Sequence, residues 1–353
     1  MSAAPVPPIP PHREPQPPRL EAPPPHGHGW RRALKWIGLG VLVIIILVVV
    51  GVVVLLKSNM AHQYVLNAAE KKVTASLGTQ VKVGNFALHF SGISPTLDLY
   101  NVTVYGAPPY QTPPLLQVDH IGVGIQVTSL LHRQWYFNSL QVDHPVARAF
   151  VDRHGTDNLP KSKSSGQSHT SIFDLGVRHA VLDRGEVYYN NRKSVLNADL
   201  HSLQFQSAFN TAARSYSGNM SYSNGRLQMG TFNPIPHDLQ ASFIASPSQF
   251  TLQRAVLTSG ASRFVLTATL SDYAHPNLQA NYDALLNTAE FRRIMKNPSL
   301  PLGDIRLNGN LQYQSRPNQP MLQAARLTGT LSSALLQLRS SSVRAQLRDL
   351  GAN

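Results

Sequence analysis

The sequence predicts a mainly β protein that one N-terminal helix holds to a membrane. Two patterns carry this prediction. The run Trp36–Leu56 contains no charged side chain and consists mostly of Val, Ile and Leu. After residue 80, apolar side chains recur at every second position in many short segments, which clusters of Asn, Gly, Ser and Pro separate. A period of two is typical of strands in a half-buried antiparallel sheet.

Composition narrows the classes of function. The chain has 353 residues and no cysteine, which excludes disulfide scaffolds, cysteine-ligated zinc sites and thiol nucleophiles. The net charge is +13, but the basic residues are scattered and no run of five occurs. We therefore expect no nucleic-acid partner, and attraction to anionic lipid surfaces fits the charge better.

Residues 1–57 are expected to lie outside the globular part. Residues 1–30 are rich in proline and predict a disordered tail. Residues 31–57 predict a transmembrane anchor between Trp36 and Leu56, since a helix rises about 1.5 Å per residue and the bilayer core is about 30 Å thick. The run is too long for a soluble strand or a signal peptide. The charges before it are Arg31, Arg32 and Lys35, so the positive-inside rule places the tail in the cytoplasm.

The part after the anchor begins with a predicted helix at 58–77. Its apolar face is expected to hold Tyr64, Val65, Ala69, Val73 and Leu77, and Gly78 is expected to end it. This helix and the first strands make up a unit at 58–160. A linker rich in Ser and Lys follows at 161–171, then further strands at 172–335, and then a polar tail with helical character at 336–353.

Period-two alternation marks the strands. It is clear at 81–90, 97–104 and 121–127, and again at 239–245, 264–270 and 305–313. About ten strands are expected in all, with an apolar face sustained over many of them. Two short helices are expected to interrupt them, at Thr128–His132 and at Asn287–Lys296. A sheet with one long apolar face must close, stack or hold an apolar ligand.

The tetrapeptide Gln-Val-Asp-His occurs at 117–120 and again at 141–144. A carboxylate beside an imidazole is a candidate metal site or acid–base pair. Neighbouring residues of a strand point to opposite faces, so an Asp and the next His cannot bind one metal ion. No third ligand stands at metal-like spacing. We interpret the two copies as repeated strand starts, with a bulge or bend between Val118 and Ile121, where the apolar phase slips.

The order of these features resembles the N-terminal region of the AsmA-like family, which includes the TamB-type proteins. The stretches that carry the resemblance are SLGTQVKVGNFALHF, SPTLDLYNVTVYG, LLQVDHIGVGIQV and SLQVDHPVARAFVDRHG, followed by TDNLP. His154 stands where an acidic residue is usual and His144 where Gly is common. Residues 36–160 carry the resemblance well and 172–335 weakly. The matching positions are Leu77-Gly78, Leu99, Asn101-Val102, Leu130-Leu131, Asp143, Pro145, Gly155 and Asn158-Leu159.

The resemblance implies a single-pass inner-membrane protein with its main domain in the periplasm. It also implies a curved, repeating β-groove with an apolar inner face, and a part in phospholipid transport between membranes and in outer-membrane biogenesis. Phospholipid is then the expected ligand, and no cofactor, metal or catalytic residue is expected. Ten residues are predicted to line the groove: Phe86, Leu88, Leu97, Leu99, Val102, Val104, Ile121, Val123, Ile125 and Val127.

Three alternatives stay open at this point. The ten apolar residues can form an ordinary sheet core against the helix at 58–77. The chain can be a scaffold that binds envelope protein partners, with the proline-rich tail recruiting a cytoplasmic protein. A hydrolase would require two or more of His120, His144, His154 and Asp119 to converge in a pocket. The sequence shows no G-x-S-x-G, P-loop or H-E-x-x-H motif for such chemistry.

Overall fold

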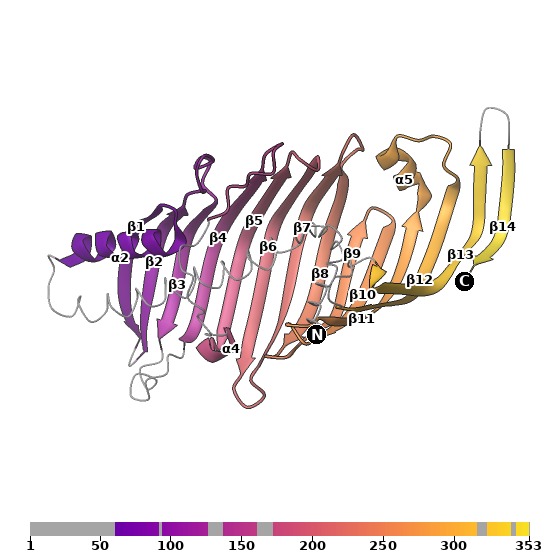
Figure 1. Ribbon diagram of the computed structural model, residues 1–353. Coiled ribbons are helices and arrows are strands. Elements are labelled where there is room, and N and C mark those ends of the chain that lie inside the picture. The colour runs from indigo at the N-terminus through magenta and orange to yellow at the C-terminus, as the bar shows by residue number, and fades with distance from the viewer. Residues whose placement is uncertain are drawn as a thin grey trace, which may run out of the picture.

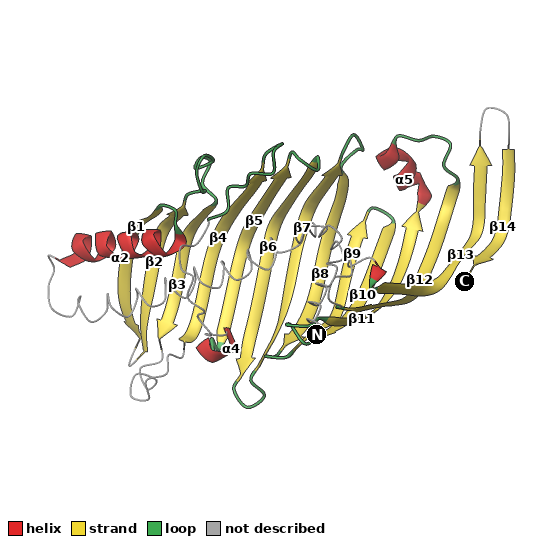
Figure 2. Cartoon of the chain, viewed as in Figure 1, coloured by secondary structure: helices red, strands yellow, loops and turns green. Residues whose placement is uncertain are grey.

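The described residues form one open sheet of fourteen strands that follow one another in chain order (Figures 1 and 2). This computed structural model describes residues 61–91, 94–125, 137–160, 172–315, 323–339 and 344–352. The predicted mainly β class is confirmed, with fourteen strands rather than about ten. The strands are β1 Val81–Ser91, β2 Ser94–Val104, β3 Leu116–Ile125, β4 Phe137–Val151, β5 His179–Asn191, β6 Leu196–Asn210, β7 Ser215–Met229, β8 Ile235–Ala245, β9 Gln249–Ser259, β10 Ser262–Ser271, β11 Asn277–Asn287, β12 Leu302–Gln314, β13 Ala325–Arg339 and β14 Arg344–Ala352.

Within the described residues, three helices accompany the sheet: α2 Ala61–Leu77, α4 Ile172–Leu175 and α5 Thr288–Met295. The helices predicted near 58–77 and 287–296 are thereby confirmed as α2 and α5. None of the helices in the described ranges is long and apolar enough to cross a membrane. The predicted tail (1–30), anchor (31–57), helix at Thr128–His132 and linker at 161–171 lie outside the described residues.

The strand pairing departs from the prediction at one place. Every neighbouring pair is antiparallel except β4 and β5, which run parallel with Asp143 opposite Asp183. A parallel pair needs a crossover connection, and α4 lies in this one. The side chains of Phe173 and Val177 join the main hydrophobic core there. The Tyr216 hydroxyl accepts a hydrogen bond from the Val177 N–H and donates one to the Ile172 carbonyl, which fixes the crossover to β7.

The C-terminal segment also differs from its prediction. The described part of 336–353, for which we expected a polar tail with helical character, continues β13 and forms β14. β14 pairs with β13 along most of its length, with Leu336 opposite Leu347. Pairing with β13 gives the backbone of this segment hydrogen-bond partners that an isolated tail lacks. These contacts outweigh the helical preference of its sequence.

Helix α2 lies across the first strands and covers the beginning of the sheet (Figure 1). Val73 and Leu77 are buried against Val81 and Val104. Gly78 ends the helix with φ 69° and donates its N–H to the Thr74 carbonyl. The expected apolar face was wrong at Tyr64, whose side chain is 73% exposed, whereas Leu66 packs against the core.

Side chains of α2 also bond to the backbone of β1. The Val81 N–H donates to Thr74 Oγ1 at 3.1 Å, and the Val83 N–H donates to Glu70 Oε1 at 2.8 Å. Unpaired N–H groups at a sheet edge invite pairing with other chains. The helix therefore caps the edge at which the sheet begins.

The alternation of side chains breaks once in the first strands. In β2, Leu99 and Val102 are three positions apart, so a regular strand would point them to opposite faces. Both nevertheless pack in one hydrophobic cluster. The same break recurs in β1, β3 and β4, as two rows of cross-strand partners show: Val83–Val102–Val118–Pro145 and Phe86–Leu99–Ile121–Val142.

We call the residues between these rows the crease: Gly84-Asn85, Tyr100-Asn101, Asp119-His120 and Asp143-His144. Asn101 and His144 adopt left-handed backbone there, with φ 52° and 48°. The pairing register does not change across the crease in β1–β4, since every strand carries the same break. The predicted slip between Val118 and Ile121 is therefore a change of phase without a bulge.

The crease continues into β5, β6 and β7 at Arg184, Ser202 and Asn224, where φ is 54°, 51° and 58°. Register shifts accompany it in these strands. A left-handed residue costs about 1–2 kcal/mol except at Gly, and Asn tolerates it best among the others. Because the break keeps apolar side chains of both strand halves on one face, their burial offsets that cost.

We expect the effect of a substitution at Asn101 on the free energy of unfolding to depend on whether the new residue tolerates left-handed backbone. Asn101→Val should lower the free energy of unfolding by about 1–2 kcal/mol, because a β-branched residue is strained at positive φ, and Asn101→Gly should not lower it. Thr103→Val, in the extended part of the same strand, is the control and should stay within about 0.5 kcal/mol. Chemical denaturation measures all three. Equal effects of the two valine substitutions would contradict the strain at the crease.

Candidate functional site

The first candidate is the apolar face of the sheet. Nine of the ten predicted groove residues lie on it, and Val127 lies outside the described residues. Seven are buried, among them Val102 and Val123 at 1% exposure. Leu88 and Leu99 are half-buried and pack against the same core. In β1–β4 these residues therefore lie in the core, with Leu66 of α2 and Phe173 of the crossover.

The apolar face extends beyond the predicted residues. Cross-strand pairs carry it from Val142 to Leu182, and on to Phe205, Met220 and Ala241. Stacked aromatic rings continue the face from β6 to β8 and β9: the centroids of Phe205 and Phe243 are 5.7 Å apart, and those of Phe243 and Phe250 are 5.8 Å apart. In β10–β13 the face continues through Leu266, Ala284, Leu307 and Leu331. These later strands were not predicted as lining, because alternation along the sequence does not show which face of the sheet each side chain joins.

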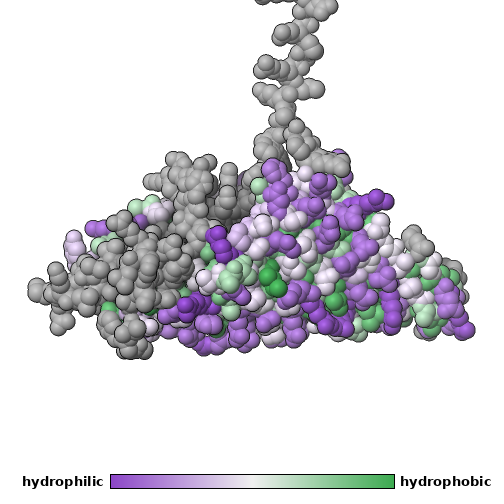
Figure 3. Space-filling model, turned by 90° about the horizontal axis from the view of Figure 1, so that it is seen from below, coloured by the Kyte–Doolittle hydropathy of each residue, from purple (hydrophilic) through white to green (hydrophobic). Residues whose placement is uncertain are grey.

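This face becomes more exposed toward the C-terminal strands. In β12, Ile305, Leu307, Leu311 and Tyr313 are half-buried, and the residues that alternate with them are exposed. On β13, Leu327 is 66% exposed and Leu331 38% exposed. Figure 3 shows apolar residues reaching the molecular surface among polar ones. The β6–β13 part of the face thus offers apolar area that the described residues do not fully cover.

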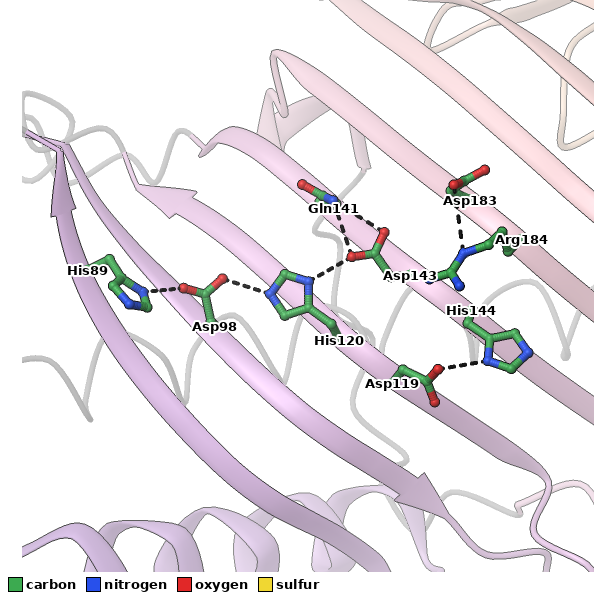
Figure 4. Close-up of polar contacts among 9 residues, drawn as sticks. All are labelled: His89, Asp98, Asp119, His120, Gln141, Asp143, His144, Asp183 and Arg184. Carbon is green, nitrogen blue, oxygen red and sulfur yellow. Dashed lines mark hydrogen bonds and ion pairs between the residues drawn. The ribbon is translucent and has the colours of Figure 1, made fainter.

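The second candidate lies on the opposite, polar face and contains both Gln-Val-Asp-His copies. These copies are antiparallel partners, so each His meets the Asp of the other copy (Figure 4). His120 Nδ1 lies 2.8 Å from Asp143 Oδ2, and His144 Nδ1 lies 2.7 Å from Asp119 Oδ2. The expectation that the Asp and the His of one copy point to opposite faces was wrong, because the change of phase between Val118 and Ile121 leaves both Asp119 and His120 on the polar face. Each of them nevertheless bonds to the other copy and not to its neighbour, and this crossed pairing, which depends on the register, was not foreseen.

A row of polar contacts runs from the first pair across β1–β4. His120 Nε2 lies 2.8 Å from Asp98 Oδ1, and His89 Nδ1 lies 2.6 Å from Asp98 Oδ2. Gln141 Nε2 donates to both oxygens of Asp143 at 3.2 Å. The Tyr100 ring stacks on His120 with centroids 5.1 Å apart. Gly122 leaves room for the row, since a Cβ there would lie 3.2 Å from Asp98 Oδ1.

His120 is bonded to a carboxylate through each ring nitrogen, which favours the imidazolium. A neutral imidazole has one N–H and would leave one carboxylate facing a lone pair. Burial by itself lowers the pKa of His120, but the hydrogen bonds to Asp143 and Asp98 outweigh it and raise that pKa above 6.5. Burial likewise acts to raise the pKa of Asp143, and hydrogen bonds from His120 and Gln141 bring it below its ordinary value.

The row is a structural element of charge-assisted hydrogen bonds. Among the described residues, no group of three or more His, Cys, Asp and Glu is placed to hold a metal ion. Asp119 and His144 meet at the surface, with side chains 61% and 36% exposed. The His154 N–H donates to Asp152 Oδ1 in a separate turn, so His154 does not join them.

Several positions that carry the family resemblance have structural roles. Asn158 is buried at 3% exposure and holds the segment after β4. Its Oδ1 accepts from the Phe150 N–H and its Nδ2 donates to the Arg148 carbonyl, each at 2.8 Å. Gly155 has φ 90°, a conformation that favours glycine. Leu130-Leu131 lies outside the described residues.

The chain matches no protein-family model and no curated protein sequence. The resemblance to the AsmA-like family therefore stays a prediction from the sequence.

Two histidines in the part of the chain that the structure describes, His120 and His237, have shifted pKa values and should titrate on opposite sides of 6.5. We expect His120 above it and His237 below it, because partial burial lowers the pKa of His237 and its hydrogen bond is with the Tyr222 hydroxyl. NMR titration of the imidazole signals, assigned with His120→Gln and His237→Gln, measures both. A midpoint for His120 at or below 6.5 would contradict the doubly bonded imidazolium.

The raised pKa of His120 also predicts how the free energy of unfolding depends on pH. The pKa of His120 is raised in the folded state, so its contribution is fully present below about pH 6.5 and is lost as pH rises through the folded value. Thermal unfolding of the wild type at a series of pH values should show this loss as a decrease of the unfolding temperature with rising pH. His120→Gln should remove that part of the pH dependence. His89→Gln, at the exposed end of the row, is the matched control and should retain the pH dependence of the wild type.

Proposed function

We propose that the apolar face of the sheet binds the acyl chains of phospholipids while their headgroups stay in water. On the predicted inner-membrane anchor, with the sheet in the periplasm, the chain would contribute to phospholipid transport between membranes and to outer-membrane biogenesis. One observation carries the proposal. The apolar face runs without interruption from β1 to β13 and is half-exposed over the later strands.

The dimensions of the sheet support an elongated ligand path. Strands lie about 4.8 Å apart, so the seven spacings from β6 to β13, where the apolar face is not fully covered, span about 34 Å. An acyl chain gains roughly 0.8 kcal/mol for each CH₂ that leaves water. A surface of Leu, Ile, Ala and Phe provides this gain at any position along the uncovered part of the face, from β6 to β13. Binding that does not depend on one polar contact suits a ligand that moves along the sheet.

The residue distribution supports binding on one face and contact with water on the other. In β12, the half-buried Leu311 lies beside the exposed Gln312, and the pattern holds from Asp304 to Gln314. An apolar surface of this extent is uncommon on a soluble monomer unless it contacts a ligand, a membrane or another protein. An envelope scaffold that binds a protein partner on the same face is the competing outcome, and the test below separates the two.

The test places a photo-crosslinking phenylalanine analogue at position 311 or at position 312 of the full chain in a Gram-negative host. We expect phospholipid adducts by mass spectrometry at position 311 and not at 312, because the two side chains point to opposite faces. Positions 266 and 267 on β10 form a second matched pair, in which Leu266 shares the apolar face. Both members of each pair carry the same anchor, so lipid held by the anchor does not affect the comparison.

A substitution provides the second arm. Leu311→Asp should reduce lipid adducts at position 266 about tenfold or more, because a carboxylate among acyl chains costs well above 1.4 kcal/mol. Gln312→Asp should leave them unchanged. Protein adducts in place of lipid at positions 311 and 266 would replace the proposal with the scaffold function. Equal lipid labelling of both faces would also refute it.

A further inference from the structure

A hollow lies on the polar face of the central strands, opposite the face proposed to bind acyl chains. It measures about 630 Å³, within the range of about 300–1,000 Å³ that is typical of small-ligand sites. Its lining comes from β6 to β10. The polar side chains of β6, β7 and β8 contribute two residues each: Gln204, Gln206, Asn219, Ser221, Gln240 and Ser242.

The pairing register assigns this hollow to the polar face. Gln204 lies opposite Ser221, Ser221 opposite Gln240, and Gln240 opposite Val256, so these side chains share one side of the sheet. Phe205 lies between Gln204 and Gln206 and pairs with Met220 on the apolar side. The sheet itself therefore separates this hollow from any lipid on the other face.

The charge of the hollow is positive. Of its twelve lining residues, Arg254 and Arg263 are the charged members, and none is acidic. Both arginines are exposed. Within the described part of the chain, neither forms an ion pair or a side-chain hydrogen bond. The nearby Asp238 accepts a hydrogen bond from the Asn224 N–H instead.

The two arginines lie on neighbouring strands, well separated along the strand direction. Arg263 lies opposite Thr258, which is four residues from Arg254 on β9. At about 3.3 Å per residue, their backbones are about 13 Å apart along the strand. This spacing fits an elongated ligand with more than one anionic group.

Beside the arginines, on β6, β7 and β8, the wall offers amides and hydroxyls, and Val256 lies between Arg254 and the position opposite Arg263. Amides and hydroxyls both donate and accept, as the hydroxyl groups of a sugar do. The wall presents no aromatic side chain for a nucleobase to stack on, since Phe205 points to the apolar face. We propose that this hollow binds an acidic oligosaccharide, with the arginines on its anionic groups and the amide rows on its hydroxyls.

The proposal is tested by calorimetric titration of the full chain in a zwitterionic detergent that has no sugar headgroup. The probe is a trimer of galacturonic acid. Maltotriose, which lacks the carboxylates, and inorganic phosphate, which lacks the sugar, are titrated in parallel. We expect the acidic trimer to bind and the two controls to bind at least about tenfold more weakly.

Variants locate the site. Arg254→Gln and Arg263→Gln should each weaken binding of the acidic trimer about fivefold or more, because each removes a charge-assisted hydrogen bond. Arg306→Gln, an exposed arginine on β12 outside the hollow, should not. Matching thermal unfolding curves will show that the variants fold alike.

Three results would overturn the proposal. Absence of binding at millimolar concentration refutes the site. Phosphate that binds as well as the trimer reduces it to a small-anion site without sugar recognition. An equal loss in Arg306→Gln shows attraction to the overall charge of the chain. None of these results bears on acyl-chain binding, which the crosslinking pairs test separately.

Discussion

The arrangement of both faces depends on the crease, where each of the first seven strands changes the phase of its side chains. Strands alternate their side chains strictly, so an apolar face across a long strand requires apolar residues at every second position. In β1–β4 the apolar residues are instead three positions apart at one place, as at Leu99 and Val102. Left-handed backbone at Asn101 and His144 resolves this mismatch. Without it, half of each strand would turn its apolar side chains to water.

The crease also creates the polar row on the other face. Asp119-His120 and Asp143-His144 are the crease residues of β3 and β4, and their antiparallel pairing crosses each Asp with the other His. The imidazolium of His120 is then held between Asp98 and Asp143. The same residues that break the apolar phase thus join the strands across the break. This gives the repeated tetrapeptide a structural role.

The two faces of one sheet have different chemistry and so support separate proposals. Acyl chains would contact side chains such as Leu307 and Leu311, and an acidic oligosaccharide would contact Arg254 and Arg263. A single layer of strands permits both, because its residues alternate between them. Helix α2 covers the edge at β1 through Glu70 and Thr74, and the strands follow one another from this edge to β14.

The sequence by itself determined the β class, α2, α5 and the apolar character of one face, because periodicity and helix-ending glycine are local signals. Single strand segments such as 121–127 and 305–313 were visible for the same reason. The parallel pairing of β4 and β5, the strand character of 344–352 and the crossed Asp–His pairs were decided by the tertiary structure. Each depends on which strand lies beside which and in what register, and pairing energy between distant segments sets that. The hollow at Arg254 and Arg263 belongs to this second group, since five strands must be in register before its wall exists.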